Sequence, residues 1–205
     1  DAAAVADVIG VILNNPASRT LTQQVYVDLG VDINSRINTE RTYTAFNVQG
    51  TGNKTIVFSN LEITNGLEVA TGAGTDVIGF EDTIIGGNLP TFFDQVPLLQ
   101  GVGGSLEIAS GSEGTGTGDV IYFTGDTEIQ YDLRMNTEGG DDDILFDGNN
   151  NFRGRSSNAG IVIGEDLLVS TGNGADILSL TNVQVDGESL IALSNGDDIF
   201  NAESS

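Results

Sequence analysis

The sequence contains Val169-Ser170-Thr171-Gly172-Asn173-Gly174-Ala175-Asp176-Ile177-Leu178, and shorter versions of this decapeptide recur along the chain. Aligned on the aspartate, the other copies are 69–78, 116–121, 139–145 and 194–200, and an earlier relative at 50–56 carries Lys54 in place of the aspartate. The aligned positions are 54, 76, 119, 143, 176 and 198, which lie 22, 43, 24, 33 and 22 residues apart. This spacing indicates one repeated unit of about 22 residues with insertions in two places.

Each unit has alternating apolar residues, then a polar glycine turn, then an aspartate and a second apolar run. This pattern predicts an all-β fold, a parallel β-solenoid (β-helix) with coils of about 22 residues, in which each coil buries its apolar side chains by stacking on its neighbours. We expect the coils to occupy residues 42–205, with insertions at 84–103 and 147–157. Residues 1–41 are expected to form an N-terminal arm or cap.

The N-terminal segment contains the clearest alternation in the sequence. Between Val25 and Ile33 every second residue is apolar, which predicts a long, half-buried strand. Residues 1–13 fit two interpretations. The apolar spacing suits an amphipathic helix that caps the solenoid, and the same residues suit an apolar arm that docks onto a neighbouring subunit.

The composition restricts both the partners and the chemistry. The chain has 30 acidic and 7 basic residues, a net charge of −23, and neither cysteine nor histidine. Nucleic acid and anionic membranes need basic surfaces, so neither is an expected partner. The sequence has no apolar run long enough to span a membrane, so membrane insertion is not expected. Without histidine or cysteine, the usual nucleophilic triads and zinc sites are excluded. The remaining oxygen ligands suit calcium.

Stacked coils would bring equivalent aspartates into a column. Two carboxylates ~4 Å apart repel by roughly 1 kcal/mol in water and about 4 kcal/mol at an effective dielectric near 20, and a divalent cation between coils would reverse this repulsion. We therefore predict calcium bound by the turn aspartates and by glycine carbonyl groups, with six to eight oxygen ligands per ion. The predicted metal ligands are Asp76, Asp119, Asp141, Asp142, Asp143, Asp176, Asp197, Asp198, Gly74 and Gly174. No catalytic residue and no organic cofactor site is predicted.

Two of the turns also resemble a known family. Gly172–Leu178 and Gly72–Ile78 resemble the G-x-G-x-D-x-apolar core of the repeat-in-toxin (RTX, hemolysin-type) calcium-binding proteins. That resemblance implies calcium held between coils of parallel β-structure, and a secreted, extracellular or cell-surface protein. The family repeats its motif as a nonapeptide, whereas the turns here are 22 or more residues apart, which favours a wider β-helix. The chain begins at Asp1 without methionine, which is typical of a processed product.

Three functions fit these features. The first is a calcium-stabilised structural protein whose copies assemble head to tail into an extracellular filament or surface layer, with Lys54 of one copy meeting Asp197 and Asp198 of the next. The second is a monomeric calcium-binding adhesin domain that contacts a cell-surface polysaccharide. The third is a lyase resembling pectate lyases, with Arg153 or Arg155 beside Asp141–Asp143. We expect the first, and therefore no enzymatic activity.

Overall fold

The computed structural model describes residues 43–48, 52–63, 66–86, 104–111, 116–148 and 160–203. Within these ranges the chain is all-β, with seventeen strands and no helix. Accordingly, none of these residues belongs to a helix long and apolar enough to cross a membrane. The predicted strand at 25–33 and the alternatives for residues 1–13 lie outside the described residues.

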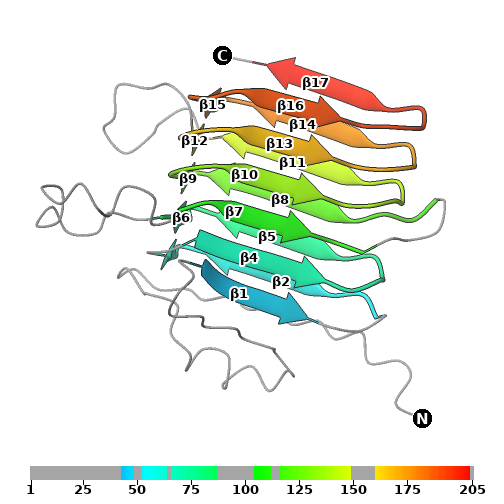
Figure 1. The fold of residues 1–205 in the computed structure, drawn as a ribbon, viewed down its shortest axis with the longest axis horizontal. Coiled ribbons are helices and arrows are strands. Elements are labelled where there is room, and N and C mark those ends of the chain that lie inside the picture. The colour runs from blue at the N-terminus through cyan, green and yellow to red at the C-terminus, as the bar shows by residue number, and fades with distance from the viewer. Residues whose placement is uncertain are drawn as a thin grey trace, which may run out of the picture.

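The strands form three parallel sheets (Figure 1). The first sheet contains, in order, β1 (Tyr43–Val48), β4 (Gly66–Thr71), β7 (Leu106–Ala109), β10 (Leu133–Asn136), β13 (Leu167–Ser170) and β16 (Ser189–Ala192). The second contains β2 (Thr55–Ser59), β5 (Val77–Glu81), β8 (Val120–Gly125), β11 (Asp143–Gly148), β14 (Ile177–Thr181) and β17 (Ile199–Glu203). The third contains β3 (Glu62–Ile63), β6 (Ile84–Ile85), β9 (Thr127–Ile129), β12 (Ile161–Ile163) and β15 (Val183–Val185).

The chain visits the three sheets in rotation, and we call each round a repeat. Repeat 1 is β1–β3, repeat 2 is β4–β6, repeat 3 is β7–β9, repeat 4 is β10–β12, repeat 5 is β13–β15, and repeat 6 is β16–β17. Every strand pairs in parallel with its counterparts in the neighbouring repeats, so the repeats lie in successive layers (Figure 1). Both predicted insertions begin later than expected, because Ile84–Ile85 form β6 and Asp147 and Gly148 end β11. Their remaining residues lie outside the described ranges, apart from Gly86.

The core follows from the alternation of side chains along each strand. In the second sheet, one inward column of side chains is at most 1% exposed and consists of Ile56, Ile78, Ile121, Ile144 and Leu178. Two residues further along each strand lies a column of stacked phenylalanine rings. Their centroids are 5.0 Å apart between Phe58 and Phe80 and between Phe80 and Phe123, and 4.5 Å apart between Phe123 and Phe146. Repetition of the same residue at the same register thus builds a continuous core.

The corner between the second and third sheets uses a left-handed backbone. Asn60, Asp82, Gly125 and Asn182 have φ values of 53°, 48°, 68° and 53° at equivalent positions in four repeats. Asparagine, aspartate and glycine are the residues that adopt this conformation at least cost. The glycine–aspartate turns were predicted from the sequence, but this second set of turns was not.

Candidate functional site

The strand register brings five aspartates from distant parts of the chain into one line, which we call the aspartate column. Its members are Asp76, Asp119, Asp142, Asp176 and Asp198, with Lys54 at the equivalent position of repeat 1. The sequence alignment placed Asp143 in this column, and that assignment is wrong. Asp143 pairs with Val120 and Ile177 and is exposed, because it is one residue further along the strand and faces the opposite side.

A chain of hydrogen bonds runs along the aspartate column. In each case the Oδ1 atom of an aspartate accepts the backbone N–H of the column residue in the preceding repeat. The bonds are Lys54 to Asp76 at 2.8 Å, Asp76 to Asp119 at 2.7 Å, Asp119 to Asp142 at 2.7 Å, Asp142 to Asp176 at 3.0 Å and Asp176 to Asp198 at 3.1 Å. The carboxylates therefore join consecutive repeats directly. A carboxylate that accepts a backbone N–H forms one of the stronger hydrogen bonds of proteins.

The second carboxylate oxygen faces a column of hydroxyl groups at the end of the first sheet. Thr137 donates to Asp142 Oδ2, and Thr171 donates to Asp176 Oδ2, each at 2.5 Å. Thr71 and Ser110 hold the same place in repeats 2 and 3. In these two repeats the hydroxyl groups of Thr71 and Ser110 are buried, and no partner in the described structure lies in hydrogen-bond geometry with them. The same holds for the carboxylate oxygens Asp76 Oδ2 and Asp119 Oδ2. The column is thus fully satisfied in repeats 4 and 5 and less so in repeats 2 and 3.

Burial changes the acidity of two carboxyl groups in the aspartate column. Desolvation raises the pKa of Asp119 to about 6, and the charges of Asp76 and Asp142 add to the rise, against the lowering effect of the Ser110 hydroxyl and the Asp76 N–H. Desolvation also raises the pKa of Asp142, together with the charges of Asp176 and Asp141. As the pH falls toward 6, Asp119 therefore begins to lose its negative charge before an ordinary aspartate would.

The other predicted metal ligands have different positions. Asp141 Oδ1 accepts the backbone N–H of Ala175 at 3.1 Å, which adds a further link between repeats 4 and 5. Asp197 is exposed, and Asp198 is half-buried. Gly174 has a φ of 154°, and a Cβ atom there would lie 1.6 Å from the carbonyl oxygen of Gly140. This glycine is needed for the close approach of two turns. In Gly74 a Cβ atom would lie 2.8 Å from the carbonyl oxygen of Gly52.

The described residues contain no group of three or more acidic side chains placed to hold one metal ion. Asp141, Asp142 and Asp143 do not converge, since the first bonds to repeat 5, the second bonds to repeat 3, and the third is exposed on β11. Arg153 and Arg155 lie outside the described residues, so the lyase arrangement has no described geometry. Calcium binding at these turns stays a prediction.

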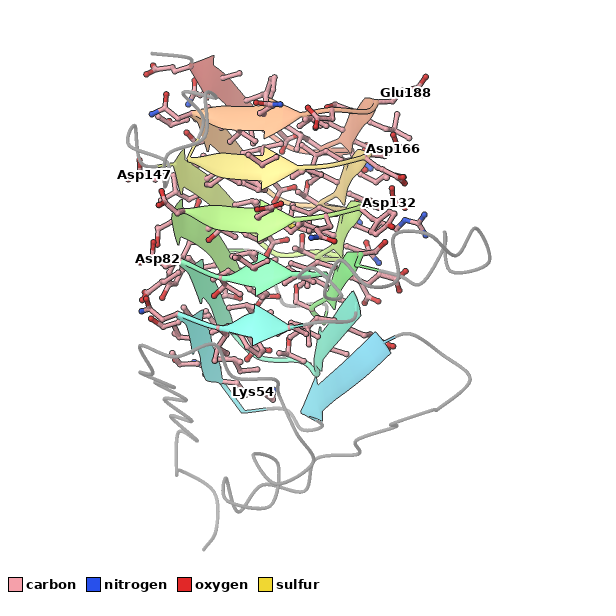
Figure 2. All side chains as sticks on the ribbon, turned by 90° about the vertical axis from the view of Figure 1, so that its left-hand side faces the viewer. Lys54, Asp82, Asp132, Asp147, Asp166 and Glu188 are labelled. Atoms are coloured by element: carbon pink, nitrogen blue, oxygen red, sulfur yellow. The ribbon has the colours of Figure 1, made fainter. Side chains whose placement is uncertain are left out.

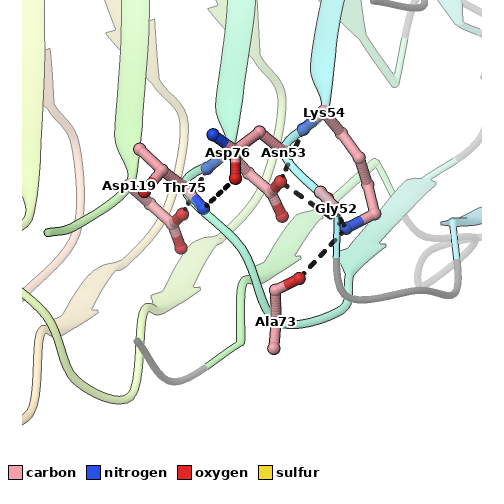
Figure 3. Close-up of polar contacts among 7 residues, drawn as sticks. All are labelled: Gly52, Asn53, Lys54, Ala73, Thr75, Asp76 and Asp119. Carbon is pink, nitrogen blue, oxygen red and sulfur yellow. Dashed lines mark hydrogen bonds and ion pairs between the residues drawn. The ribbon is translucent and has the colours of Figure 1, made fainter. Parts of the chain in front are cut away.

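Lys54 is buried within its own chain, with 4% of its side chain exposed. Figure 3 shows its polar contacts. Its Nζ atom donates to the carbonyl oxygen of Gly52 at 2.7 Å and to that of Ala73 at 3.4 Å, and it lies 3.6 Å from Asp76 Oδ1. The ammonium group therefore neutralises the first carboxylate of the aspartate column. An ion pair with Asp197 or Asp198 of another copy would require it to leave this position.

A second acidic column, which the sequence analysis missed, marks the corner before the first sheet. Asp132, Asp166 and Glu188 immediately precede β10, β13 and β16 and lie above one another (Figure 2). Asp132 Oδ1 accepts the backbone N–H of Asp166 at 3.3 Å, and Asp166 Oδ1 accepts that of Glu188 at 2.9 Å. These carboxylates accept from the following repeat, the opposite direction to the aspartate column. An acidic residue directly before each of the strands that begin at Leu133, Leu167 and Ser189 was the signal in the sequence.

Repeat 6 leaves its apolar side chains exposed. Phe200 continues the inward column of Ile144 and Leu178, yet it is 50% exposed, while those two residues are 1% and 0% exposed. Ile199 is 48% exposed and Leu190 is 66% exposed. β16 and β17 are the last strands of their sheets, so no described strand pairs with their outer edges (Figure 1).

The outer face of the first sheet carries a shallow groove of about 490 Å³. Glu107 and Arg134 lie on one part of it and Leu168 and Leu190 on another, all at one register position in successive strands. Arg134 is held by Asp132 at 2.7 Å and by Glu107 at 3.7 Å. The groove therefore combines a fixed cation with an apolar floor.

No protein-family model, no curated protein and no solved structure matches this chain.

Proposed function

We propose that the chain is a parallel β-solenoid that serves as an extracellular structural building block, and that it associates with a second copy of itself through repeat 6. The observation that carries this proposal is the exposure of Phe200. Its side chain occupies a core column that is at most 1% exposed in the five preceding repeats, yet it is 50% exposed itself. A second copy placed against repeat 6 would cover this side chain and continue the apolar column.

The solenoid part of the proposal rests on the register. Each repeat places its apolar side chains beside their counterparts in the next repeat, and no single repeat can bury them alone. Adjacent repeats are also joined by the aspartate column, which adds one link between repeats at every step. Each added repeat contributes further apolar contacts and a further link, so a longer stack is more stable. This property suits a structural protein.

The association part rests on the strand edges of repeat 6. The outer edges of β16 and β17 present backbone N–H and C=O groups in register with exposed apolar side chains, and such edges pair with other strands. A second copy offers edges of the same spacing. The net charge of −23 opposes this contact, so association should strengthen as salt screens the repulsion.

The contact does not use the expected ion pair, since Lys54 is buried against Asp76. Pairing between two copies of repeat 6 would produce a closed dimer, whereas contact between repeat 6 and a different surface would produce growing filaments. Sedimentation at increasing concentration distinguishes the two, because a dimer reaches a fixed size and a filament does not.

A matched pair of variants tests the surface. Phe200 and Asn201 are neighbours in β17 and face opposite sides of the sheet. We expect Phe200→Lys to abolish association and Asn201→Lys, with the same charge change, to retain it. A wild-type chain that remains monomeric at high concentration and high salt would remove the proposal.

A second candidate, the monomeric adhesin, is favoured by the groove on the first sheet. Arg134 and Asn136 supply donors, and Leu168 supplies an apolar floor of the kind that sugar rings contact. Binding of acidic and neutral polysaccharides by the wild type, compared with Arg134→Ala, tests this alternative.

A further inference from the structure

Lys54 is the only lysine among the 205 residues, and it is buried. Lysine is among the residues that are almost never fully buried unless they are paired. Here it lies at the position of the aspartate column where every later repeat has an aspartate. The burial of Lys54 at this position can be explained by an ion pair with Asp76 or by a covalent reaction with it.

The amine group lies beside a carboxyl group that is fully buried. Lys54 Nζ is 3.6 Å from Asp76 Oδ1, and Asp76 is 0% exposed. Charge-assisted hydrogen bonds between an ammonium group and a carboxylate are usually about 2.7–2.9 Å long, so this pair forms no such bond. The amine group therefore lies beside this carboxyl group without a direct hydrogen bond to it.

The two side chains are held in this arrangement by the backbone. They immediately precede β2 and β5, which are paired from Thr55 and Val77 onward. The Lys54 N–H donates to Asp76 Oδ1 at 2.8 Å, and the Asp76 Oδ2 atom is buried without a hydrogen-bond partner in the described structure. The carboxyl group is thus fixed through one oxygen, and its other oxygen is not engaged.

An acid lies on the far side of Asp76. Asp119 Oδ1 accepts the Asp76 N–H at 2.7 Å, and Figure 3 shows Asp76 between Asp119 and Lys54. Asp119 Oδ2 is also buried and without a hydrogen-bond partner in the described structure.

We propose that Lys54 and Asp76 form an intramolecular isopeptide bond, assisted by the carboxyl group of Asp119. The Lys54 ammonium group gives one proton to the Asp76 carboxylate, and the resulting amine attacks Asp76 Cγ. An N–Cγ bond forms, a Cγ–O bond breaks, and the hydroxyl group leaves as water with a second proton from nitrogen. The Asp119 carboxyl group, when it is in its acid form, would donate a hydrogen bond to the reacting carboxyl group, and it is unchanged at the end. The reaction needs no oxidant and no co-reactant.

The product would tie repeat 1 to repeat 2 covalently. Lys54 and Asp76 are 22 residues apart, so the bond would close a loop of one full repeat between the first two described repeats. It would oppose local separation of these two repeats.

The test is the mass of the intact, full-length chain, recorded under denaturing conditions. We expect the wild type to be lighter than its sequence by one water molecule. Lys54→Arg keeps the positive charge but cannot form this amide, so it should have its full sequence mass. Asp76→Ala should also have its full mass. Asp119→Asn should accumulate the product more slowly during incubation after purification, by at least tenfold.

Tryptic digestion then locates the bond. Trypsin should fail to cleave after Lys54 in the wild type, and fragmentation should place the missing water between Lys54 and Asp76. A wild type at its full sequence mass after prolonged incubation at neutral pH would overturn the proposal. Water loss that persists in Lys54→Arg would overturn it too, since succinimide formation at Asp147-Gly148 or Asp186-Gly187 has the same mass change.

Discussion

The backbone N–H of Asp119 donates a hydrogen bond of 2.7 Å to the Oδ1 atom of Asp142, one repeat further along the chain. Thr137 donates to the other oxygen of the same carboxyl group. One buried side chain therefore satisfies a donor from the preceding repeat and a hydroxyl group from its own. Asp143, its neighbour in sequence, is exposed on β11.

Replacement of Asp142 by alanine should therefore lower the free energy of unfolding by about 3 kcal/mol, because a buried N–H and a buried hydroxyl group lose their acceptor. Asp142→Asn keeps the Oδ1 acceptor and should cost much less. Asp143→Ala should stay within about 0.5 kcal/mol of the wild type. Urea denaturation measures all three. Equal losses for Asp142→Ala and Asp143→Ala would contradict the register.

The raised pKa of Asp119 predicts that stability depends on pH. The pKa is about 6 in the folded state, above the ordinary aspartate value of 3.8 that applies to the unfolded state, so the folded state binds the proton more tightly. This contribution is complete below pH 3.8 and is lost as the pH rises through 6, by roughly 3 kcal/mol at most. The raised pKa of Asp142 acts in the same direction.

Thermal unfolding between pH 4 and 8 checks this prediction, with Asp119→Asn as the comparison because it cannot titrate at that position. We expect the wild type to lose stability over this interval more steeply than the variant. Parallel curves for the two proteins would show that Asp119 does not titrate as proposed.

The repeat could be predicted from the sequence because its turns and apolar runs recur at similar spacing. The register in repeat 4 was ambiguous because three consecutive aspartates, Asp141, Asp142 and Asp143, all follow a glycine turn. The spacing between the aspartate and the buried core residues that follow it resolves this ambiguity. Asp142 is followed at the second and fourth positions by Ile144 and Phe146, as Asp76 is by Ile78 and Phe80. Alignment on the phenylalanine column would have given the correct register.

Other features depended on contacts between repeats. The left-handed turns at Asn60, Asp82 and Asn182 each lie six residues after the column residue of their repeat, a spacing that becomes significant only once the register is known. The direction of the hydrogen bonds along the aspartate column could not be read from the sequence, since it depends on which backbone N–H each carboxylate faces. For the same reason the burial of Lys54 was not predicted.

Removal of metal ions tests the calcium prediction at the aspartate column. Each Oδ1 atom from Asp76 to Asp198 already accepts a backbone N–H, so the repeats are joined without a cation. If these hydrogen bonds alone join the repeats, EGTA should shift the melting temperature by less than about 2 °C, against the roughly 2–8 °C that accompanies a change of 1 kcal/mol, and that result would remove the calcium prediction. A large fall that added calcium reverses, and that Asp142→Asn abolishes, would show that calcium bridges the column.

The glycine at position 174 tests the close approach of adjacent turns. A Cβ atom there would lie 1.6 Å from the carbonyl oxygen of Gly140, and the φ of 154° is also unfavourable for other residues. Gly174→Ala should therefore force repeats 4 and 5 apart and cost about 3 kcal/mol or more. Gly52 lies at the equivalent turn of repeat 1, where a Cβ atom would meet no atom of the described residues within 4 Å. Gly52→Ala should be nearly neutral. Similar stabilities of the two variants would mean that the turns are further apart than described.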